Sequence, residues 1–513
     1  MRAKELLFAA ATAAALGGCA VGPNYKTPPT PVPDAFDVGP ASPATTQPTT
    51  AASRPVDITR WWASLGDPEL DSLVDRAVRA NLDLKIALAR LQQSRAQEYV
   101  VTGGTLPLVD FAAGAGRGTG SDSTRSRIPG PLHSAANTSG YKEITEVAGF
   151  DATWEIDFFG RFTRETEAAR ADTQAAYEAR NAALITLVSD VARAYVEERA
   201  IAQRLAVAQH NLAIQQQSVD LVTARFNQGI TNELDVTLAK RELATVQSTI
   251  APLQAGIAQS QRRIAVLLGE LPQDLYAELQ RETPLPSPPE KFQPGLPIEL
   301  LRRRPDIRQA ERELAASTAR IGVATADLFP RVALVASGGF QGQGLGRTPV
   351  MYKGIWSFGP SLYWPFLDFG TFDAILERQD FRTQELLYHY QRAVLTAVEE
   401  VDDAISNYQA QRDRLDRLND AVAASAQAVD LATKRYERGL TDFLNVLDAQ
   451  RQLFELQDQQ AVAEESVVVQ YIALYKALGG GWERYQQVPE IRHPQPALIA
   501  AGRETVKPTP APQ

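Results

Sequence analysis

The sequence repeats itself at a spacing of 210 residues, which restricts the fold to one built from two similar halves. The stretch "RFNQGITNELDVTLAKREL" at 225–243 returns as "RYERGLTDFLNVLDAQRQL" at 435–453. At the same spacing Trp154 corresponds to Trp364, and Leu268-Gly269 corresponds to Leu478-Gly479. Two copies are too few for a solenoid, which usually needs three or more repeats. The sequence therefore predicts an internal duplication.

Each half contains one run without proline or glycine that is much longer than an ordinary helix, at 161–226 and at 371–436. A helix of that length would extend for roughly 100 Å. In the second run, mostly apolar residues recur at alternating steps of four and three, and they would form one seam along the helix. Two polar residues, Arg412 and Asn419, interrupt this seam. This pattern is typical of a coiled coil. An apolar stripe of such length needs neighbouring helices along its whole extent.

Four shorter segments alternate between apolar and polar residues. "EVAGFDATWEIDFF" and "GIWSFGPSLYWPF" do so most clearly, and "LPLVDFAAGAG" and "FPRVALVASGGF" precede them. We predict strands at about 106–117, 145–158, 329–341 and 354–367, arranged as two hairpins. The aromatic faces suit lipid and the polar faces suit water. A soluble sandwich would also alternate, but four strands between very long helices argue against it.

Four such strands cannot close a barrel of useful width, and open strand edges are not tolerated in lipid. Several chains must then contribute strands to one barrel, and three copies would supply twelve. The sequence thus demands an oligomer, although it does not by itself demand a trimer.

The N-terminus "MRAKELLFAAATAAALGGCA" carries a basic start, an apolar run and small residues before the single cysteine, Cys19. Residues 1–18 are predicted to be a secretory signal peptide. "LGGC" resembles a bacterial lipobox, which implies cleavage before Cys19 and acylation of that residue; the alternative is an ordinary signal with a chance cysteine. Ala20, in place of Asp, resembles a signal for sorting to the outer membrane. Residues 19–60, rich in Pro and Thr, are predicted to form an extended leash.

The composition excludes several classes of protein. The formal charge of −9 argues against a nucleic-acid partner, which requires a basic face. One cysteine and four histidines, which form no motif, predict neither an internal disulfide nor a metal site. There is no phosphate-binding loop, so catalysis is the weakest reading, and we expect no catalytic residue and no cofactor other than a covalent lipid on Cys19.

The remaining boundaries follow from the repeat. The first repeat is assigned to 61–270, a proline-rich connector to 271–297, the second repeat to 298–480 and a C-terminal segment to 481–513. One helix is expected from Pro68 to about residue 103. Upstream of the strands the two halves align at a spacing of 223, from Pro107 to Pro330. The first hairpin therefore has a longer loop, which is polar and is expected to be exposed.

Three segments carry a resemblance to a known family. "CAVGPNYKTP" opens the mature chain, "WWASLGDPELDSLVDRAVRANLDLKIALARL" follows, and "RPDIRQAERELAAS" lies in the second half. With the lipobox and the duplication, they resemble the TolC-like outer-membrane factors, and within them the OprM and NodT type of efflux lipoprotein. The resemblance covers nearly all of the mature chain.

This resemblance implies a mainly α-helical TolC-like fold with a small transmembrane β portion. It implies a homotrimer with a shared twelve-stranded barrel in the outer membrane, a long helical barrel in the periplasm and an equatorial belt. The connector and both mature termini would supply that belt. The implied partners are a periplasmic adaptor protein and an inner-membrane transporter, typically of the resistance-nodulation-division (RND) type.

The repeated turn is where each long helix must reverse. Gly229 and Gly439 can take the left-handed conformation that ends a helix. Thr231 and Thr441 follow two residues later and are candidates to cap the next helix. Both motifs could be hairpin turns only. The resemblance implies that they form the periplasmic tip where the adaptor docks, with three polar candidates for that contact: Arg225, Arg435 and Arg438.

The helix after the second turn is a candidate constriction. In "LTDFLNVLDAQR", Leu444 and Asp448 share one face and Arg451 lies close to them. In a symmetric ring an aspartate attracts cations and an apolar residue blocks wetting. By resemblance, Leu444 and Asp448 align with the gate of efflux outer-membrane factors. Asp448 could instead be an ordinary solvated helical aspartate.

Two further gate residues rest on the resemblance. Asn445 occupies a position that carries a second aspartate in TolC, so the ring should be less acidic here. Asp235 is the equivalent of Asn445 in the first half, and with Tyr436 it is implied to link neighbouring helices and hold the tip closed.

The predicted function is that of a passive exit duct for small molecules in a tripartite pump. Two alternatives remain: a duct for type I protein secretion, and a lipid-anchored periplasmic coiled-coil scaffold. The sequence does not identify the cargo.

Overall fold

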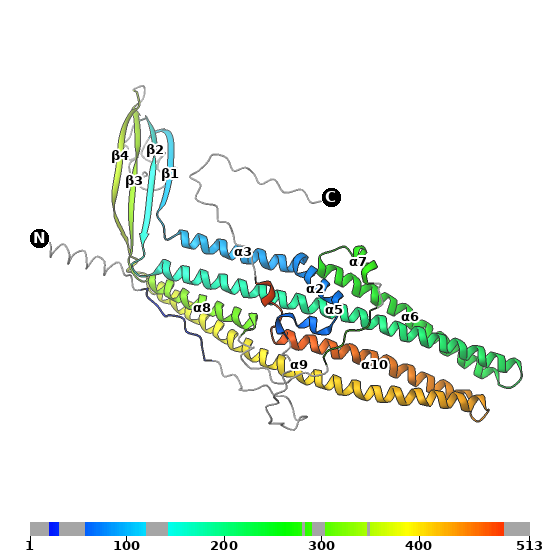
Figure 1. Cartoon of the computed structure of the whole chain (residues 1–513). Coiled ribbons are helices and arrows are strands. Elements are labelled where there is room, and N and C mark those ends of the chain that lie inside the picture. Colours follow the sequence, from blue (N-terminus) through cyan, green and yellow to red (C-terminus); the bar gives the residue numbers. More distant parts are fainter. Residues whose placement is uncertain are drawn as a thin grey trace.

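The molecule is elongated, with a β-sheet at one end and two helical hairpins at the other (Figure 1). The computed structural model describes residues 20–29, 57–119, 142–279, 283–289, 303–345 and 349–486. Cys19 lies outside the described residues. The elements are η1 Ile58–Leu65, α2 Pro68–Ala80, α3 Leu82–Gly103, β1 Leu108–Thr119, β2 Lys142–Ile156, α5 Arg161–Asn227, α6 Glu233–Leu268, α7 Pro272–Leu279, α8 Pro305–Ala326, β3 Arg331–Leu345, β4 Met351–Tyr363, α9 Thr371–Glu437, α10 Phe443–Ala477 and η3 Glu483–Tyr485.

The four strands form one antiparallel sheet in the order β1-β2-β3-β4, so the two predicted hairpins join through β2 and β3. The registers of the two hairpins are equivalent. Leu108 pairs with Thr153 and Arg331 pairs with Tyr363, which are the same positions at the spacings of 223 and 210. The duplication therefore holds for the backbone pairing as well as for the sequence.

One face of the sheet carries exposed aromatic side chains from every strand: Phe111, Phe150, Trp154, Phe340, Trp356 and Phe358. Val147, Asp151 and Gln341, on the opposite face, are buried. The predicted two-faced strands are thus present. Among the described strands, β1 and β4 each pair on one side only, which leaves two open edges.

The long helices predicted from the proline-free runs are α5 and α9, each of 67 residues. Beside the sheet, α3 packs on α5, α5 on α8 and α8 on α9, so α3 and α9 lie at the two sides of one helical layer (Figure 1). Farther from the sheet, α5 pairs with α6 and α9 with α10. These two hairpins end at the repeated turns.

The main hydrophobic core lies part-way along the helices. Trp61 and Trp62 of η1 are almost fully buried there, together with residues of α2, α5, α7, α9 and α10. The ring of Trp61 stacks on Tyr475 with centroids 5.7 Å apart. This core joins the N-terminal segments to both repeats.

One expectation about the helices was wrong. The single helix expected from Pro68 to about residue 103 is broken at Asn81, whose side chain caps α3 by accepting from the backbone N–H of Leu84 at 2.8 Å. The connector 271–297 contains a helix, α7, whose residues Leu275 and Leu279 are buried. Pro272 stands at its first position, where proline is well tolerated.

None of the described helices is both long enough and apolar enough to cross a lipid bilayer.

Candidate functional site

Both repeated turns end a helix in the same way. Gly229 and Gly439 have φ angles of 73° and 71°, in the left-handed region predicted for them. The N–H of Ile230 donates to the carbonyl of Arg225 at 3.0 Å, and the N–H of Leu440 donates to that of Arg435 at 2.9 Å. This is the Schellman arrangement of a helix C-terminus.

The two threonines do not cap the following helices by themselves. Asn232 is the cap of α6 and accepts from the N–H of Asp235 at 3.0 Å, while Asp442 holds the equivalent place before α10 without a side-chain bond. Thr231 instead donates to the carboxylate of Asp235, and Thr441 accepts from Asn445 at 2.8 Å. Both threonines thus bind the side chain four residues later, which closes each turn.

Arg225 joins the two hairpins within one chain. Its guanidinium lies 4.5 Å from the ring centroid of Tyr436 and donates to the carbonyls of Tyr436 and Glu437 at 3.2 and 3.4 Å. An arginine placed there satisfies the last carbonyl groups of α9. Arg225 is half-buried, whereas Arg435 and Arg438 are exposed. Among the three arginines proposed for adaptor docking, only these last two present a free surface.

Tyr436 is buried in a small apolar cluster at the tip. Its ring lies 5.5 Å from that of Phe443, and the cluster also takes residues of α5 and α6. Its hydroxyl group has no hydrogen-bond partner among the described residues. Asp235 binds Thr231 of its own turn. Within one chain, Tyr436 therefore links helices by packing rather than through Asp235.

The four α10 residues proposed for the gate are all exposed. Asp448 accepts from Arg451 at 3.2 Å, and Arg451 also lies 3.8 Å from Glu455. The side chain of Leu444 is 58% exposed. The side-chain amide of Asn445 donates to the hydroxyl group of Thr441 in the preceding turn. The predicted face of α10 thus presents the apolar side chain of Leu444 and the carboxylate of Asp448, whose charge is partly neutralised by Arg451.

Exposed apolar side chains recur at equivalent places on the two turns. Ile230 and Leu440 are 61% and 63% exposed, and Leu234 is 62% exposed where its equivalent Leu444 is 58% exposed. Sequence reasoning selected only Leu444. The spacing of 210 could have found the other three, because each pair repeats at that distance.

A polar seam runs between the two hairpins. Arg204 of α5 binds Asp458 of α10 at 2.7 Å, Asn211 donates to Gln457 at 3.2 Å and Gln215 donates to Gln450 at 3.3 Å. These side chains can exchange their partners for water when the helices separate, at a smaller cost than apolar ones. The two hairpins are therefore joined by this polar seam along their length and by the apolar cluster around Tyr436 at the tip.

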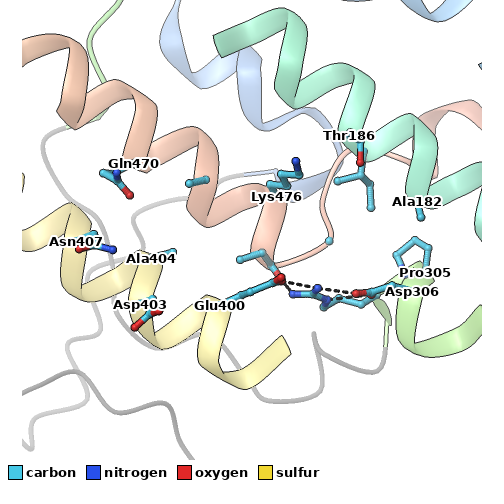
Figure 2. Close-up of a pocket in the computed structure, with 15 residues that line it drawn as sticks. Ala182, Thr186, Pro305, Asp306, Glu400, Asp403, Ala404, Asn407, Gln470 and Lys476 are labelled. Atoms are coloured by element: carbon cyan, nitrogen blue, oxygen red, sulfur yellow. Dashed lines mark hydrogen bonds and ion pairs between the residues drawn. The ribbon is translucent and has the colours of Figure 1, made fainter. Parts of the chain in front are cut away.

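A buried arginine fastens the second repeat near the middle of the molecule. Arg304 binds Asp306 at 2.6 Å, Glu400 at 2.7 Å and the carbonyl of Ala477 at 2.7 Å (Figure 2). These contacts lie in an open pocket of about 540 Å³ between α5, α8, α9 and α10. Burial acts to lower the pKa of Arg304, but the two carboxylates outweigh it, and the pKa lies above its usual value. Asp306 is two residues from Arg304, whereas Glu400 and Ala477 are distant along the chain, so their convergence on Arg304 could not be predicted from the sequence.

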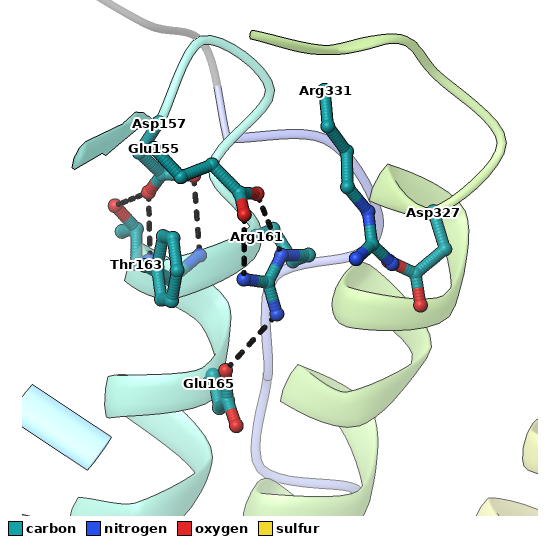
Figure 3. Close-up of polar contacts among 8 residues, drawn as sticks. Glu155, Asp157, Arg161, Thr163, Glu165, Asp327 and Arg331 are labelled. Carbon is teal, nitrogen blue, oxygen red and sulfur yellow. Dashed lines mark hydrogen bonds and ion pairs between the residues drawn. The ribbon is translucent and has the colours of Figure 1, made fainter. Parts of the chain in front are cut away.

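The junction between sheet and helices is held by charged pairs. Asp157 accepts from the N–H groups of Phe162 and Thr163 at 3.1 and 2.8 Å, and so caps α5 (Figure 3). Arg161 binds Glu155 at 3.1 Å, and Arg331 binds Asp327 at 2.7 Å. Strands and helices of each repeat are thereby fixed to one another.

Residues 20–29 are extended, but they are docked and do not behave as a leash. Arg164, itself buried, donates to the carbonyls of Val21 and Gly22 and to the side chain of Asn24 at 3.1, 3.3 and 2.7 Å. Tyr25 packs with alanines of α5 and α8 and donates to Glu311 at 3.3 Å. The segment next to Cys19 is therefore part of the folded body, in a groove between the two repeats.

No group of three or more His, Cys, Asp and Glu side chains that could hold a metal ion occurs in the part of the chain that the structure describes.

Comparison with known proteins agrees with this architecture. The family described as outer membrane efflux protein matches residues 73–270 and, again, residues 296–480. Nodulation protein T of Rhizobium leguminosarum bv. trifolii is 31% identical over 91% of this chain and 95% of its own. The toluene efflux pump outer membrane protein TtgC of Pseudomonas putida is 32% identical over 94% of this chain and 96% of its own.

The solved structure of the outer-membrane channel OprN is similar to this fold. It superimposes with a TM-score of 0.79 at 36% identity, over 90% of this chain and 100% of that chain.

Proposed function

The chain belongs to the outer membrane efflux protein family, and on that premise we propose that it is the passive exit duct of a tripartite efflux pump. The protein is located in the outer membrane, with its helices in the periplasm. The proposal further assigns it to a homotrimer, joined through a periplasmic adaptor to an inner-membrane transporter of the RND type. Small molecules would pass through the duct without being chemically altered by it.

The observation that carries this proposal is the incomplete sheet. It has an aromatic outer face and two open edges, β1 and β4. In lipid, unpaired backbone groups at an edge cost several kcal/mol each, so strands of other chains must cover them. Three chains would close a barrel of twelve strands around a duct.

The tip supplies the means of regulation. Closed and open states would differ in the separation of the two hairpins, along the polar seam and at the contact between Arg225 and Tyr436. An adaptor that binds the exposed apolar and arginine side chains of the turns in one state only would shift the population toward that state. Asp448 and Leu444 would form rings at the narrowest point, and Asp235 and Tyr436 would stabilise the closed state.

The cargo is assigned only as small molecules. The names of the two relatives refer to toluene efflux and to nodulation, although both are about equally similar to this chain. An exit duct wide enough for many solutes reads little of their chemistry, so the transporter would select the cargo.

Acylation of Cys19 is part of the proposal. Its support is the lipobox-like "LGGC" together with the docking of the following residues 20–29 beside the junction of sheet and helices. The protein itself would need no other cofactor and would catalyse no reaction.

The test has two arms. First, the purified protein is reconstituted in planar bilayers, where the proposal predicts ion conductance. A form carrying Cys19→Ser behind an ordinary signal peptide should still require detergent for extraction. No conductance, together with release of this form without detergent, would instead establish a lipid-anchored scaffold.

The second arm identifies the partner. A photo-crosslinker at Arg438, on the exposed turn, should capture an adaptor in cells, and the same group at Arg76, paired with Glu270 far from the tip, should not. An adaptor that co-purifies with an RND transporter supports the proposal. One that co-purifies with an ATP-driven protein-secretion transporter would overturn it in favour of a type I duct.

A further inference from the structure

A polar pocket opens between α3, α5 and α8, close to where these helices meet the sheet (Figure 1). Its volume is about 610 Å³. Four threonines line it, among them Thr163 and Thr166, together with Tyr25, Glu167, Arg170 and Arg312. We call it the junction pocket. None of its lining residues belongs to the proposed gate or to the turns at the tip.

The junction pocket lies on the face of the helical layer that carries the N-terminal segment. Tyr25, six residues after Cys19, forms part of its wall. A second pocket of about 540 Å³ lies between the same three helices and is lined by residues that include Arg90 and Asp172. Arg170 and Asp172 are two residues apart on α5, so their side chains point about 200° apart around the helix axis. The two pockets therefore open on opposite faces of the layer.

The junction pocket begins beside exposed apolar residues at the ends of the strands. Leu106, next to the lining residue Thr105, is 66% exposed. Phe158 and Trp364, just after β2 and β4, are 37% and 52% exposed. Aromatic residues at the ends of membrane-spanning strands mark the boundary between hydrocarbon and lipid headgroups. Thr163 lies in the first turn of α5, so the pocket opens on the periplasmic side of this boundary.

Two lining groups on one face of α5 are left available for a ligand. The side chain of Arg170 is 66% exposed and has one ion pair among the described residues, from Nε to Glu98 at 3.5 Å. The hydroxyl group of Thr166 is buried without a hydrogen-bond partner in that part of the chain. A helical threonine can donate to the carbonyl group four residues earlier, as Thr102 does at 2.8 Å. A buried hydroxyl group that lacks any partner calls for one from outside the chain.

The junction pocket also offers charges of both signs. Arg312 is fixed at one wall, where it binds Glu311 at 2.5 Å and lies 5.7 Å from the ring centroid of Tyr25. Glu167 accepts from Arg164 at 2.8 Å and is still 44% exposed. Arginine and hydroxyl donors suit the oxygens of a phosphate group, and an exposed carboxylate suits an ammonium group. The lining therefore fits a zwitterionic phosphate ester.

We propose that the junction pocket binds the phosphoethanolamine headgroup of a phospholipid in the periplasmic leaflet of the outer membrane. The phosphate group binds Arg170 and the hydroxyl group of Thr166, which are four residues apart and share a face of α5. The ammonium group binds Glu167. The occupant is a lipid because the pocket opens beside the lipid-facing ends of the strands. This inference goes beyond the proposed duct, and it takes from it only that the face carrying the N-terminal segment is the outer one.

The second repeat has no equivalent of this site. At the spacing of 210, Thr166 corresponds to Leu376 and Arg170 corresponds to Asp380. An apolar side chain and a carboxylate do not bind a phosphate group. One headgroup is therefore expected for each chain.

Native mass spectrometry of the full-length protein in detergent tests the site. The probe is phosphatidylethanolamine with short acyl chains, and its binding should saturate at one molecule for each chain. Arg170→Ala should weaken this binding at least about tenfold, because it removes a charged donor to the phosphate group. Arg90→Ala is the matched control, since Arg90 is an exposed arginine in the pocket on the opposite face. It should leave the affinity unchanged.

Two conservative substitutions test the two ends of the headgroup. Thr166→Val keeps the shape of the side chain but removes its hydroxyl group. It should weaken phosphatidylethanolamine and phosphatidylglycerol alike, by about threefold or more. Glu167→Gln should weaken only phosphatidylethanolamine, because phosphatidylglycerol has no ammonium group. An equal loss of both lipids in Glu167→Gln would contradict the assigned orientation of the headgroup.

The outcomes separate this inference from the proposed function. Equal affinities in the unchanged protein and in Arg170→Ala, or an equal loss in Arg90→Ala, would overturn the lipid site. Displacement of the lipid by inorganic phosphate would also overturn it, because the pocket would then be a general anion site. Each of these results leaves the exit duct standing if the protein remains trimeric and conducts ions. Loss of the trimer and of conductance in the unchanged protein would overturn the duct itself.

Discussion

At the tip, the guanidinium of Arg225 binds the carbonyl groups at the end of α9 and lies over the ring of Tyr436. A cation over an aromatic ring stabilises by about 0.5–1 kcal/mol at a partly exposed site. Hydrogen bonds from a charged donor add a similar or larger amount. Since these contacts join α5 to α9, they stabilise the state in which the two hairpins are together.

We expect Arg225→Ala to favour the open tip. A loss of about 1–2 kcal/mol would raise the open-to-closed ratio by about five- to thirtyfold. The measurement is the open probability in planar bilayers, with cellular sensitivity to a large antibiotic as a second readout.

Arg435→Ala is the matched control, because this arginine is exposed at the equivalent end of the other hairpin. An open probability that rises equally in both variants, or in neither, would show that Arg225 does not specifically stabilise the closed tip.

Asp448 is exposed on the proposed gate face of α10, with Arg451 3.2 Å away. A unit charge at about 6 Å in water changes the energy of an ion by about 0.7 kcal/mol, a factor of about three in its local concentration. We therefore expect Asp448→Asn to lower the cation-to-anion permeability ratio by about threefold, as measured from reversal potentials in a salt gradient.

Asp430→Asn is the control variant. Asp430 is also exposed and paired with a cation, Lys434, but it lies on α9 rather than on the proposed gate face of α10. Selectivity that follows Asp430 and ignores Asp448 would place the constriction elsewhere.

Two adjacent arginines differ sharply in burial. The side chain of Arg304 is 8% exposed, whereas that of Arg303, paired with Glu483, is 49% exposed. Arg304→Ala should lower the free energy of unfolding by about 2–3 kcal/mol, because it leaves a buried carbonyl without a donor and two carboxylates without their cation. Arg303→Ala should cost less than about 1 kcal/mol. Denaturant unfolding of the solubilised protein gives both values, and a reversed order would contradict this account of the pocket in Figure 2.

Among the elements, the turns depend on glycine for a backbone reason. A Cβ at Gly229 or Gly439 would meet no atom within 4 Å, so only the positive φ opposes a side chain. Gly229→Ala and Gly439→Ala should each destabilise the turn by about 1–2 kcal/mol. Hydrogen exchange of the tip amides measures this difference.

Gly256→Ala is the control with the opposite sign. This glycine lies inside α6, where an added Cβ would lie in ordinary contact with Ile201 at 3.4 Å. Alanine should stabilise the helix there by up to about 1 kcal/mol. Loss of protection in all three variants would mean that the turns are not held by their left-handed glycines.

The long helices and the strands could be predicted because their signals are local. No proline or glycine interrupts the two long runs, and the alternation of Phe150 and Trp154 with Asp151 is unambiguous. The break at Asn81 could not be predicted, since apolar residues continue at helical spacing across it. The docking of residues 20–29 was hidden because their partners, Arg164 and Glu311, are distant in the sequence.

In the candidate site, too, the local features could be predicted from the sequence and the contacts between distant residues could not. The repeat identified the turns, with Gly229 and Gly439, and the exposed face of α10. It could not show that Arg225 is engaged by α9, because this contact joins residues of different hairpins. For the same reason the contacts of Arg304 with Glu400 and Ala477 could not be predicted, although Arg304 opens the quoted stretch "RPDIRQAERELAAS". The proposed roles of Leu444, Asp448 and Asp235 depend on neighbouring chains and remain predictions.

For the whole molecule, the sheet and the helical layer each end in two elements that have a neighbour on one side only. The open strands β1 and β4 lie at the two edges of the sheet, and α3 and α9 lie at the two sides of the helical layer. The open edges of the sheet and the free sides of the helical layer fit the proposed ring of copies, in which each chain presents two different surfaces to its neighbours.

The most direct measurement is the native mass of the full-length protein, extracted gently in detergent and shown by circular dichroism to retain its helices. We expect three times the mass of the mature lipidated chain. A stable, folded monomer would contradict it, because the open edges of the sheet would then need no sister subunit.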